Sequence, residues 1–475
     1  MTHMLPFDAD PALAEASEVI DELRRVRIAL RHSAPDSAAA LAHAAERAAL
    51  TKRLRTLCDA PVSGPMLRDH FTERAVILRL ALTARAEAAA VQRAHDAASD
   101  IVASSVSANR ELTAAERSQV RDLRDTAAPG HWRSGVISAS RRDGVLDTLG
   151  TLRLRDARKE LRDGLLLTAQ MRAIIDEARP ALLRGAPVLF IGETGGAKTA
   201  LTEYLSRRVL GAEPELVSGY GDITSAQVIG SHELRAESGA TVSVFVPGPL
   251  LRGMIEGRPV ILDEINAMPP EFLKRLNRIL QLRPGDRFGV QEHQGREITI
   301  APGFAVLATA NEQTPHRYRG IDRLSAELVN RFGASGYRVH YPDHGLSFDH
   351  FPAENALLAA AAIVDERGML PSSISSDELM RVVRAAFISQ QVFAGSHGAG
   401  FSEFVSTERE IDGRPGLDEA VLAPRTLVAV LQKVAGSGGE VTLERALQRF
   451  VESVMHAEDR HVLTHIFEGQ GFSVR

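Results

Sequence analysis

A glycine-rich segment in the middle of the chain constrains the fold more than any other feature. The residues GETGGAKT (192–199) follow the apolar run APVLFIG (186–192) and precede the helical pattern TALTEYLSRRVL (199–210). A strand, a glycine-rich turn and a helix in this order are typical of a loop that binds phosphate through backbone N–H groups and the positive end of the helix dipole. We therefore expect an α/β fold built around a phosphate-binding loop.

The side chains of this loop are suited to a nucleotide and its metal ion. Lys198 is expected to reach the β- and γ-phosphates of ATP, and the hydroxyl of Thr199 is expected to bind Mg²⁺. The chain has only five lysines, so a lysine inside a glycine-rich loop is informative. The expected nucleotide-binding residues are Gly192, Glu193, Thr194, Gly195, Gly196, Ala197, Lys198, Thr199 and Ala200. Ala197 departs from the commonest pattern, which has glycine there, and a glycine-rich turn without a ligand is the alternative.

A second motif, VILDEIN (260–266), places two carboxylates at the end of an apolar strand. We expect Asp263 to hold Mg²⁺ through water and Glu264 to polarise the attacking water. Taken alone, the motif is equally consistent with solvated acids at a strand end. It lies about 65 residues after Lys198, however, and a third strand within 301–311 ends in Asn311 about 45 residues later. Three strand-end polar groups in this order favour a catalytic site.

The pattern along the chain predicts four regions. An all-α N-terminal domain occupies 1–127, with helices near 11–32, 36–58, 65–108 and 113–127. A linker and lead-in helix follow at 128–164, and the segment APGHWRSG (128–135) breaks the helical pattern. Alternating strands and helices at 165–345 predict a doubly wound parallel sheet, and 346–475 reads as a C-terminal α-helical lid.

Composition narrows the class of protein. Hydrophobic content of 44%, charged content of 25% and a net charge of -5 are ordinary for a globular protein and give no overall electrostatic case for nucleic acid or anionic membranes. No membrane span and no signal peptide are expected from the sequence. Cys58 is the only cysteine, so no internal disulfide can form and a cytoplasmic location is expected.

The motifs together resemble the AAA+ ATPases of the helix-2-insert clade. The resemblance rests on GETGGAKT, on the segment VFVPGPLLRGMIEGRPVILDEINAMPPEFLKRLNRIL (244–280), on VLATANE (306–312) and on ELVNRF (327–332). It is closest to MoxR-like proteins and to midasin- and dynein-related modules, and some MoxR-like members also have alanine before the lysine. The resemblance covers about residues 165–435.

The resemblance implies roles for three further residues. Asn311 resembles sensor 1, which helps to orient the water that attacks ATP. Arg331 stands where the family has an arginine finger, which reaches the γ-phosphate of the neighbouring subunit, and Arg323 is a second candidate. Arg425 resembles sensor 2 of the helical lid. Arg331 and Arg425 also have purely structural interpretations, as a helix-end arginine and as part of a common Pro-Arg helix start.

The resemblance also implies partners. We expect a homo-oligomer, as a hexameric ring, that couples ATP hydrolysis to remodelling or assembly of a protein with a von Willebrand factor A domain. Two alternatives stay open: a McrB-like motor acting on nucleic acid in defence, and a nucleotide-dependent scaffold with low turnover. Nucleic acid is possible as a partner but is not indicated by the charge of the chain.

Two other segments have weaker interpretations. Residues 218–249 would form the helix-2 insert, in which Asp222 and Glu233 match family positions loosely, or a β-hairpin with a structural role only. The segment HYPDHGLSFDHF (340–351) holds three histidines, but it reads as a loop without a framework to fix metal ligands, so we expect no metal there.

Overall fold

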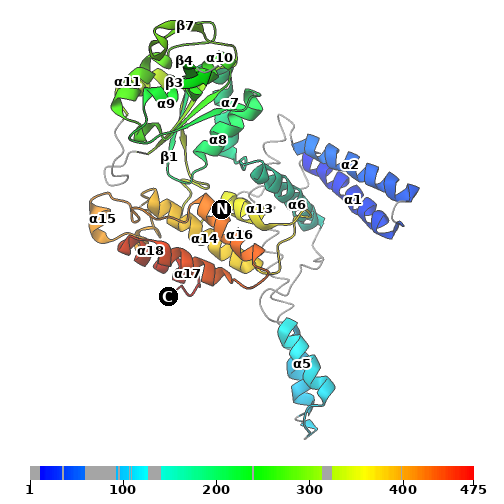
Figure 1. Cartoon of the computed structure of the whole chain (residues 1–475). Coiled ribbons are helices and arrows are strands. Elements are labelled where there is room, and N and C mark those ends of the chain that lie inside the picture. The colour runs from blue at the N-terminus through cyan, green and yellow to red at the C-terminus, as the bar shows by residue number, and fades with distance from the viewer. Residues whose placement is uncertain are drawn as a thin grey trace.

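The computed structural model describes residues 11–34, 37–58, 93–94, 97–105, 107–108, 110–126, 141–237, 240–312, 324–396 and 398–474. These residues form an α/β core next to a C-terminal helical unit, with further helices from the N-terminal part of the chain (Figure 1). The predicted architecture is therefore confirmed: an α/β core built on a parallel sheet, with helical regions before and after it. The predicted linker at 128–135, residue Arg323 and most of the predicted helix at 65–108 lie outside the described residues.

Five parallel strands form the central sheet in the order β2-β5-β8-β1-β9. Their bounds are Val188–Gly192 for β1, Glu215–Ser218 for β2, Val260–Asp263 for β5, Val306–Asn311 for β8 and Gly336–Val339 for β9. Gly192 is in register with both Asn311 and Val339, and Ser218 is in register with Asp263. The carboxyl ends of the strands therefore meet at one edge of the sheet, which is where parallel α/β folds bind their ligands.

Helices cover both faces of the sheet, and the side chains of the central strands are therefore mostly apolar. One face packs on α7 (Ala169–Leu183), on α8 (Lys198–Tyr204) and on the π-helical turn Leu205–Val209. The other face packs on α10 (Pro249–Glu256), α11 (Pro270–Ile279) and α12 (Ala326–Phe332). The result is a three-layer sandwich with a separate hydrophobic cluster on each side of the sheet.

The sequence predicted the three central strands but not the two edge strands. The predicted strands at 186–192, 259–264 and within 301–311 are confirmed, and their buried side chains explain the continuous apolar runs. Strands β2 and β9 have four residues each and one buried residue each, so neither produces an apolar run. Short edge strands of this kind give a weak sequence signal.

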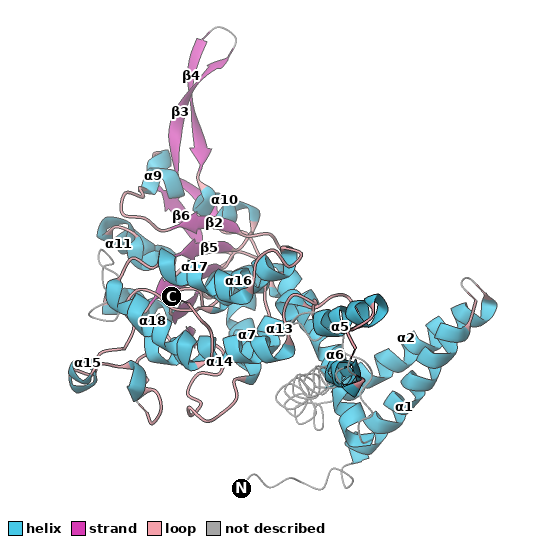
Figure 2. Ribbon diagram, turned by 90° about the horizontal axis from the view of Figure 1, so that it is seen from below, coloured by secondary structure: helices cyan, strands magenta, loops and turns pink. Residues whose placement is uncertain are grey.

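Two β-hairpins extend from the core. The predicted insert at 218–249 forms the short helix α9 (Ser225–Val228) followed by a hairpin of β3 (Gly230–Glu237) and β4 (Ala240–Pro247). This hairpin projects well beyond the sheet (Figure 2). The second hairpin, β6 (Arg287–Val290) with β7 (Arg296–Thr299), was not anticipated from the sequence. The ring of Phe245 stacks on His293 with centroids 4.3 Å apart, so β4 contacts the turn of the second hairpin.

The described N-terminal residues are helical, as predicted. Helices α1 (Pro11–His32) and α2 (Ala38–Cys58) lie side by side, and α5 is formed by Ala114–Thr126 (Figure 1). The predicted capping box at α5 is confirmed, because the backbone N–H of Thr113 donates to Glu116 and that of Glu116 donates to Thr113 Oγ1. Helix α6 (Arg141–Arg162) joins these helices to the C-terminal unit, since its Leu154 and Ala157 lie in the hydrophobic core of that unit.

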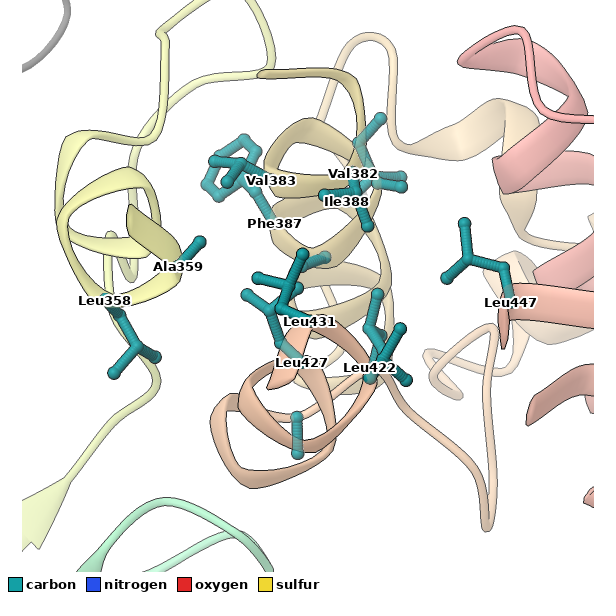
Figure 3. Packing of buried hydrophobic residues seen from close by; sticks show 14 of the residues in the cluster. Leu358, Ala359, Val382, Val383, Phe387, Ile388, Leu422, Leu427, Leu431 and Leu447 are labelled. Atoms are coloured by element: carbon teal, nitrogen blue, oxygen red, sulfur yellow. The ribbon is translucent and has the colours of Figure 1, made fainter. Parts of the chain in front are cut away.

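The C-terminal unit is a helical lid with its own core. Its helices are α13 (Ala353–Ile363), α14 (Ser376–Phe393), α15 (Thr407–Ile411), α16 (Pro424–Gly436), α17 (Leu443–Ser453) and α18 (Ala457–Gly469). Phe387 and Ile388 of α14, Leu427 and Leu431 of α16, and Leu447 of α17 pack together (Figure 3). Burial of each such side chain contributes about 1.5–3 kcal/mol to stability. This cluster includes no residue of the five central strands, so the lid has a hydrophobic core separate from that of the sheet.

A buried chain of polar groups joins the lid to the end of the sheet. The carboxylate of Asp343 accepts hydrogen bonds from the backbone N–H groups of Glu354 and Asn355 and from Asn355 Nδ2. Burial raises the pKa of Asp343 to about 6, and these N–H donors oppose that rise. The side-chain amides of Asn355 and Gln390 bond to each other twice, at 3.1 Å each, and Gln390 Nε2 also donates to the carbonyl oxygen of Leu422. Leu422 lies two residues before α16 begins.

Within the described part of the chain, no helix is both long enough and apolar enough to cross a membrane.

Candidate functional site

The glycine-rich loop has the backbone conformation that a phosphate-binding loop requires. Strand β1 ends at Gly192, helix α8 begins at Lys198, and Gly195 and Ala197 between them are left-handed, with φ of 73° and 66°. A Cβ at Gly192 would lie 2.1 Å from the carbonyl oxygen of Val339, so only glycine allows β1 and β9 to approach this closely. The loop residues Glu193, Thr194 and Gly196 lie between these fixed ends, and Ala200 follows in the first turn of α8.

Two contacts from beyond the sheet hold this loop. The hydroxyl of Tyr341 donates to the carbonyl oxygen of Thr194 at 2.7 Å. A Cβ at Gly195 would lie 2.9 Å from Cβ of Ala423, the residue that precedes α16. The loop is therefore in contact both with the segment that leads into the lid and with the lid itself.

Lys198 is buried at the centre of the site, with 7% of its surface exposed. Its ammonium group donates to the carbonyl oxygens of Gly192 and Glu193, at 2.9 and 2.8 Å, and to Asn311 Oδ1 at 3.0 Å. Burial lowers the pKa of Lys198, while the charges of Glu193, Asp263 and Glu264 raise it. A buried cation at the end of a glycine-rich loop is suited to bind the phosphates of a nucleotide.

Asp263 and Thr199, which were expected to share a magnesium ion, lie directly beside one another. The hydroxyl of Thr199 donates to Asp263 Oδ1 at 2.9 Å, across two elements that are 64 residues apart in the sequence. Both side chains offer oxygen atoms, which are the ligands that Mg²⁺ prefers. The residues present therefore fit a magnesium site at the end of β5.

Glu264 follows Asp263 in a conformation that non-glycine residues rarely adopt, with φ of 55° and ψ of 50°. Such a conformation costs on the order of 1–3 kcal/mol and persists where the surroundings fix it. One constraint is Gly219, at which a Cβ would lie 2.2 Å from the carbonyl oxygen of Glu264. Asn311 Nδ2 approaches Glu264 Oε1 at 3.5 Å, so Glu264 and Asn311 lie together at the edge of the sheet.

Two buried polar residues of this site were missed from the sequence. Thr309 Oγ1 donates to Asp263 Oδ1 and accepts from the backbone N–H of Glu264. Asn266 bonds to the backbone of Asn311 on both sides, through its Nδ2 to the carbonyl oxygen at 3.2 Å and through its Oδ1 from the N–H at 3.4 Å. For Thr309 the sequence did contain a signal. Side chains alternate along a strand, and Thr309 lies two residues before Asn311, so both side chains point to the same side of the sheet.

The two arginines implied by the family resemblance lie in different surroundings. Arg425 is exposed in the first turn of α16, and its charge contributes to lowering the pKa of Lys198. Arg331 in α12 pairs with Glu327 at 3.1 Å. When the side-chain amide of Gln281 is turned so that its oxygen faces Arg331, this oxygen accepts hydrogen bonds from both terminal nitrogens of the guanidinium group, at 3.0 and 3.2 Å. In the described part of the chain, Arg331 forms no hydrogen bond or ion pair with the loop at 192–200.

The three histidines of the segment at 340–351 do not converge. The rings of His340 and His344 stack with centroids 4.0 Å apart, whereas His350 bonds to the hydroxyl of Ser347. Burial lowers the pKa of His344, and the neighbouring His340 lowers it further. In the insert, Glu233 is exposed and pairs with Arg235, and Asp222 is exposed before α9.

A polar cavity of about 210 Å³ lies along α8, the helix that begins at Lys198. It is lined by Asp163, Gly164, Ala200, Glu203, Tyr204, Arg207 and Arg208. Ala200, Glu203 and Tyr204 belong to α8, the helix that begins at Lys198, so the cavity lies along the same helix as the phosphate-binding loop.

Together, the fold and the site define a P-loop nucleotide-binding core. Residues 187–332 match the family model of the AAA domain of the dynein-related subfamily. The α/β core of this chain is accordingly that of an AAA+ ATPase, and nucleotide binding and ATP hydrolysis are the general activity of this class of site.

Two relatives and one solved structure give further comparisons. An uncharacterized protein of Staphylococcus epidermidis is 32% identical over 162 residues, which cover 34% of this chain and 59% of that protein. The uncharacterized protein YojN of Bacillus subtilis is 34% identical over 164 residues, covering 34% of this chain and 51% of YojN. The chain thus spans between half and two thirds of the length of these relatives. NtrX from Brucella abortus in complex with ATP is 15% identical and covers 70% of this chain and 77% of that chain, with a TM-score of 0.32, which is too low to support a conclusion.

Ala197 leads to a prediction about stability. Replacing Ala197 with glycine should remove about 1–2 kcal/mol of left-handed strain, while the extra freedom of the unfolded chain offsets about 0.4–1 kcal/mol of that gain. We expect the variant to unfold at the same temperature as the wild type or slightly above it. The matched control is Ala200→Gly in the adjacent helix, which should lower stability by about 1 kcal/mol. Thermal unfolding followed by circular dichroism compares the two, and equal losses would contradict the role of the left-handed residue.

Proposed function

We propose that this chain is a magnesium-dependent ATPase that assembles into a ring and uses ATP turnover to remodel a protein partner. The observation that carries the proposal is the direct hydrogen bonding among five motif residues at the carboxyl ends of the strands. Lys198 bonds to Asn311, Asn311 approaches Glu264, and Thr199 bonds to Asp263. The decisive test is turnover of ATP by the purified chain with Mg²⁺ present and with Mg²⁺ chelated.

The side chains of the site divide the work of hydrolysis. The loop at 192–197 and Lys198 bind and orient the phosphates through N–H groups and charge. Glu264 accepts a hydrogen bond from the attacking water and so aligns it with the γ-phosphate, with Asn311 fixing the position of that carboxylate. Thr199 and Asp263 would hold Mg²⁺, which neutralises charge that develops on the phosphate oxygens.

The base and ribose have a place next to the phosphates. We infer that they enter the cavity at Ala200, because its lining residues Ala200, Glu203 and Tyr204 belong to α8, the helix that begins at Lys198. Arg425 approaches the site from the lid side. In this arrangement a single nucleotide touches the sheet, α8 and the lid, so its binding couples the lid to the core.

The position of Arg331 favours an oligomer. It lies at the end of α12, and its guanidinium contacts Glu327 and Gln281 rather than the loop of its own chain. An arginine that completes the site of a neighbouring copy would have to face outward in this way. We therefore assign Arg331 to the active site of an adjacent subunit, in a ring that the family resemblance makes hexameric.

The projecting hairpin supports a protein partner. Leu234 and Val242, near its tip, are 76% and 40% exposed. Exposed apolar side chains on a protruding hairpin are suited to contact another protein. On the family resemblance, a protein with a von Willebrand factor A domain is the proposed partner. Pulldown of such a partner by the wild type, and its loss in a Leu234→Ser variant that retains turnover, tests this assignment.

Replacing Lys198 with alanine should weaken nucleotide binding itself. The variant loses a charged partner of the phosphates, which corresponds to about 1.5–3 kcal/mol or about ten- to a hundredfold in affinity. Titration with a fluorescent ATP analogue measures the loss. The matched control is Lys433→Ala, an exposed lysine in α16, which should bind as the wild type does. Unchanged affinity in the Lys198 variant would exclude the loop as the phosphate site.

A further inference from the structure

Thr309 is a buried polar residue in β8 to which no sequence motif assigned a role. Its side chain is fully buried, at 0% exposure. Its hydroxyl donates to Asp263 Oδ1 at 2.6 Å and accepts from the backbone N–H of Glu264 at 2.9 Å. One hydroxyl group therefore bonds to both acidic residues of the VILDEIN motif.

The contact lies where the backbone pairing of the two strands stops. The ladder between β5 and β8 ends with Leu262 opposite Ala308, and the next residue of β8 is Thr309. Beyond that point Glu264 turns into the left-handed conformation, so its N–H leaves the ladder. The hydroxyl of Thr309 accepts a hydrogen bond from this N–H in place of a strand partner. Backbone N–H groups without a partner are strongly disfavoured inside proteins, so this bond stabilises the local backbone.

The same hydroxyl determines how the carboxylate of Asp263 is presented. Thr199 and Thr309 both donate to Oδ1, while Oδ2 has no hydrogen-bond partner among the described residues. Two donors on one oxygen fix the rotation of the carboxylate and leave the other oxygen for a cation. Residues that bond to a metal ligand in this way usually tune its affinity and geometry.

We propose that Thr309 is a positioning residue for ATP hydrolysis, which sets both the metal-binding carboxylate of Asp263 and the backbone of Glu264. The proposal rests on the magnesium-dependent ATPase activity proposed above and adds a residue to it. Because the side chain of Thr309 is fully buried and its hydroxyl bonds to Asp263 and to the N–H of Glu264, we assign its effect to these two partners.

The test uses variants that separate the hydroxyl from the shape of the side chain. Thr309→Val keeps the branched shape and removes the hydroxyl, whereas Thr309→Ser keeps the hydroxyl. The matched control is Ser206→Ala, a fully buried hydroxyl that donates only to the carbonyl oxygen of Thr202. All four proteins, including the wild type, are measured in full length for steady-state turnover and for the Mg²⁺ dependence of mant-ATP binding.

We expect Thr309→Val to raise the Mg²⁺ concentration at the binding midpoint, or to lower kcat, by about ten- to a hundredfold. KM at saturating Mg²⁺ should change less than threefold, and Thr309→Ser should recover most of the loss. Wild-type values of both the Mg²⁺ midpoint and kcat in the valine variant would overturn the proposal, as would equal losses in the valine and serine variants. If the wild type does not turn over ATP, the proposed ATPase function fails, but the Mg²⁺ midpoints of the variants still decide the role of Thr309.

Discussion

Replacing Glu264 with glutamine should leave ATP binding close to that of the wild type and lower turnover by about 10²–10⁴-fold. The carboxylate that aligns the attacking water is lost, and general-base contributions have this magnitude. Binding should persist because Lys198 and Asp263 are unchanged, and their hydrogen bonds do not involve the Glu264 side chain.

Single-turnover hydrolysis and nucleotide titration separate the two effects. Glu256→Gln is a suitable control, because Glu256 is an exposed acid at the end of α10, remote from the carboxyl edge of the sheet. A glutamine variant of Glu264 that turns over ATP at the wild-type rate would remove this residue from the mechanism. Loss of binding instead would indicate that its left-handed backbone had rearranged.

The second large effect is expected at Arg331. Its replacement by alanine should lower turnover by about 10³–10⁵-fold, the contribution that an arginine finger makes by meeting charge that develops in the transition state. The fold should be little affected, because both partners of Arg331, Glu327 and Gln281, are exposed, and an exposed helical ion pair contributes only about 0.3–0.5 kcal/mol. Arg449→Ala is the matched control, since Arg449 forms a similar surface pair with Glu452 and lies in the lid.

Mixing the variants tests whether the arginine acts between subunits. A ring that contains both Arg331→Ala and Glu264→Gln subunits has some interfaces at which an intact Glu264 meets an intact Arg331. Part of the activity should return in the mixture, and wild-type activity should rise more than linearly with protein concentration until rings are complete. If mixed rings form and stay inactive, Arg331 does not act in trans, and Arg323 becomes the residue to test.

The sequence predicted the elements whose side chains are buried on all sides and the residues that end them. Strands β1, β5 and β8 lie inside the sheet, so their apolar runs and the polar residues that follow them were visible in sequence. The edge strands were not visible, because half-exposed segments of four residues resemble loops. The hairpin of β6 and β7 was missed for the same reason.

The sequence predicted where the site lies better than it predicted which residues form it. Motif residues such as Lys198 and Asp263 can be identified from the sequence by their residue type and their spacing. Thr309 and Asn266 do not, because their importance comes from hydrogen bonds across strands that are 45 or more residues apart in the chain. Residue type alone cannot distinguish a buried threonine that packs from one that fixes a carboxylate.

The buried amide pair between Asn355 and Gln390 has a mechanical consequence for the lid. Apolar helices can slide past each other by a fraction of a turn, but two reciprocal amide bonds break together if either helix shifts. This junction therefore resists sliding of α13 past α14, and the hydrogen bond from Gln390 to Leu422 ties it to the segment before α16. Because Ala423 and Tyr341 both touch the phosphate-binding loop, a displacement of that loop would act at two points on the region that this junction holds together.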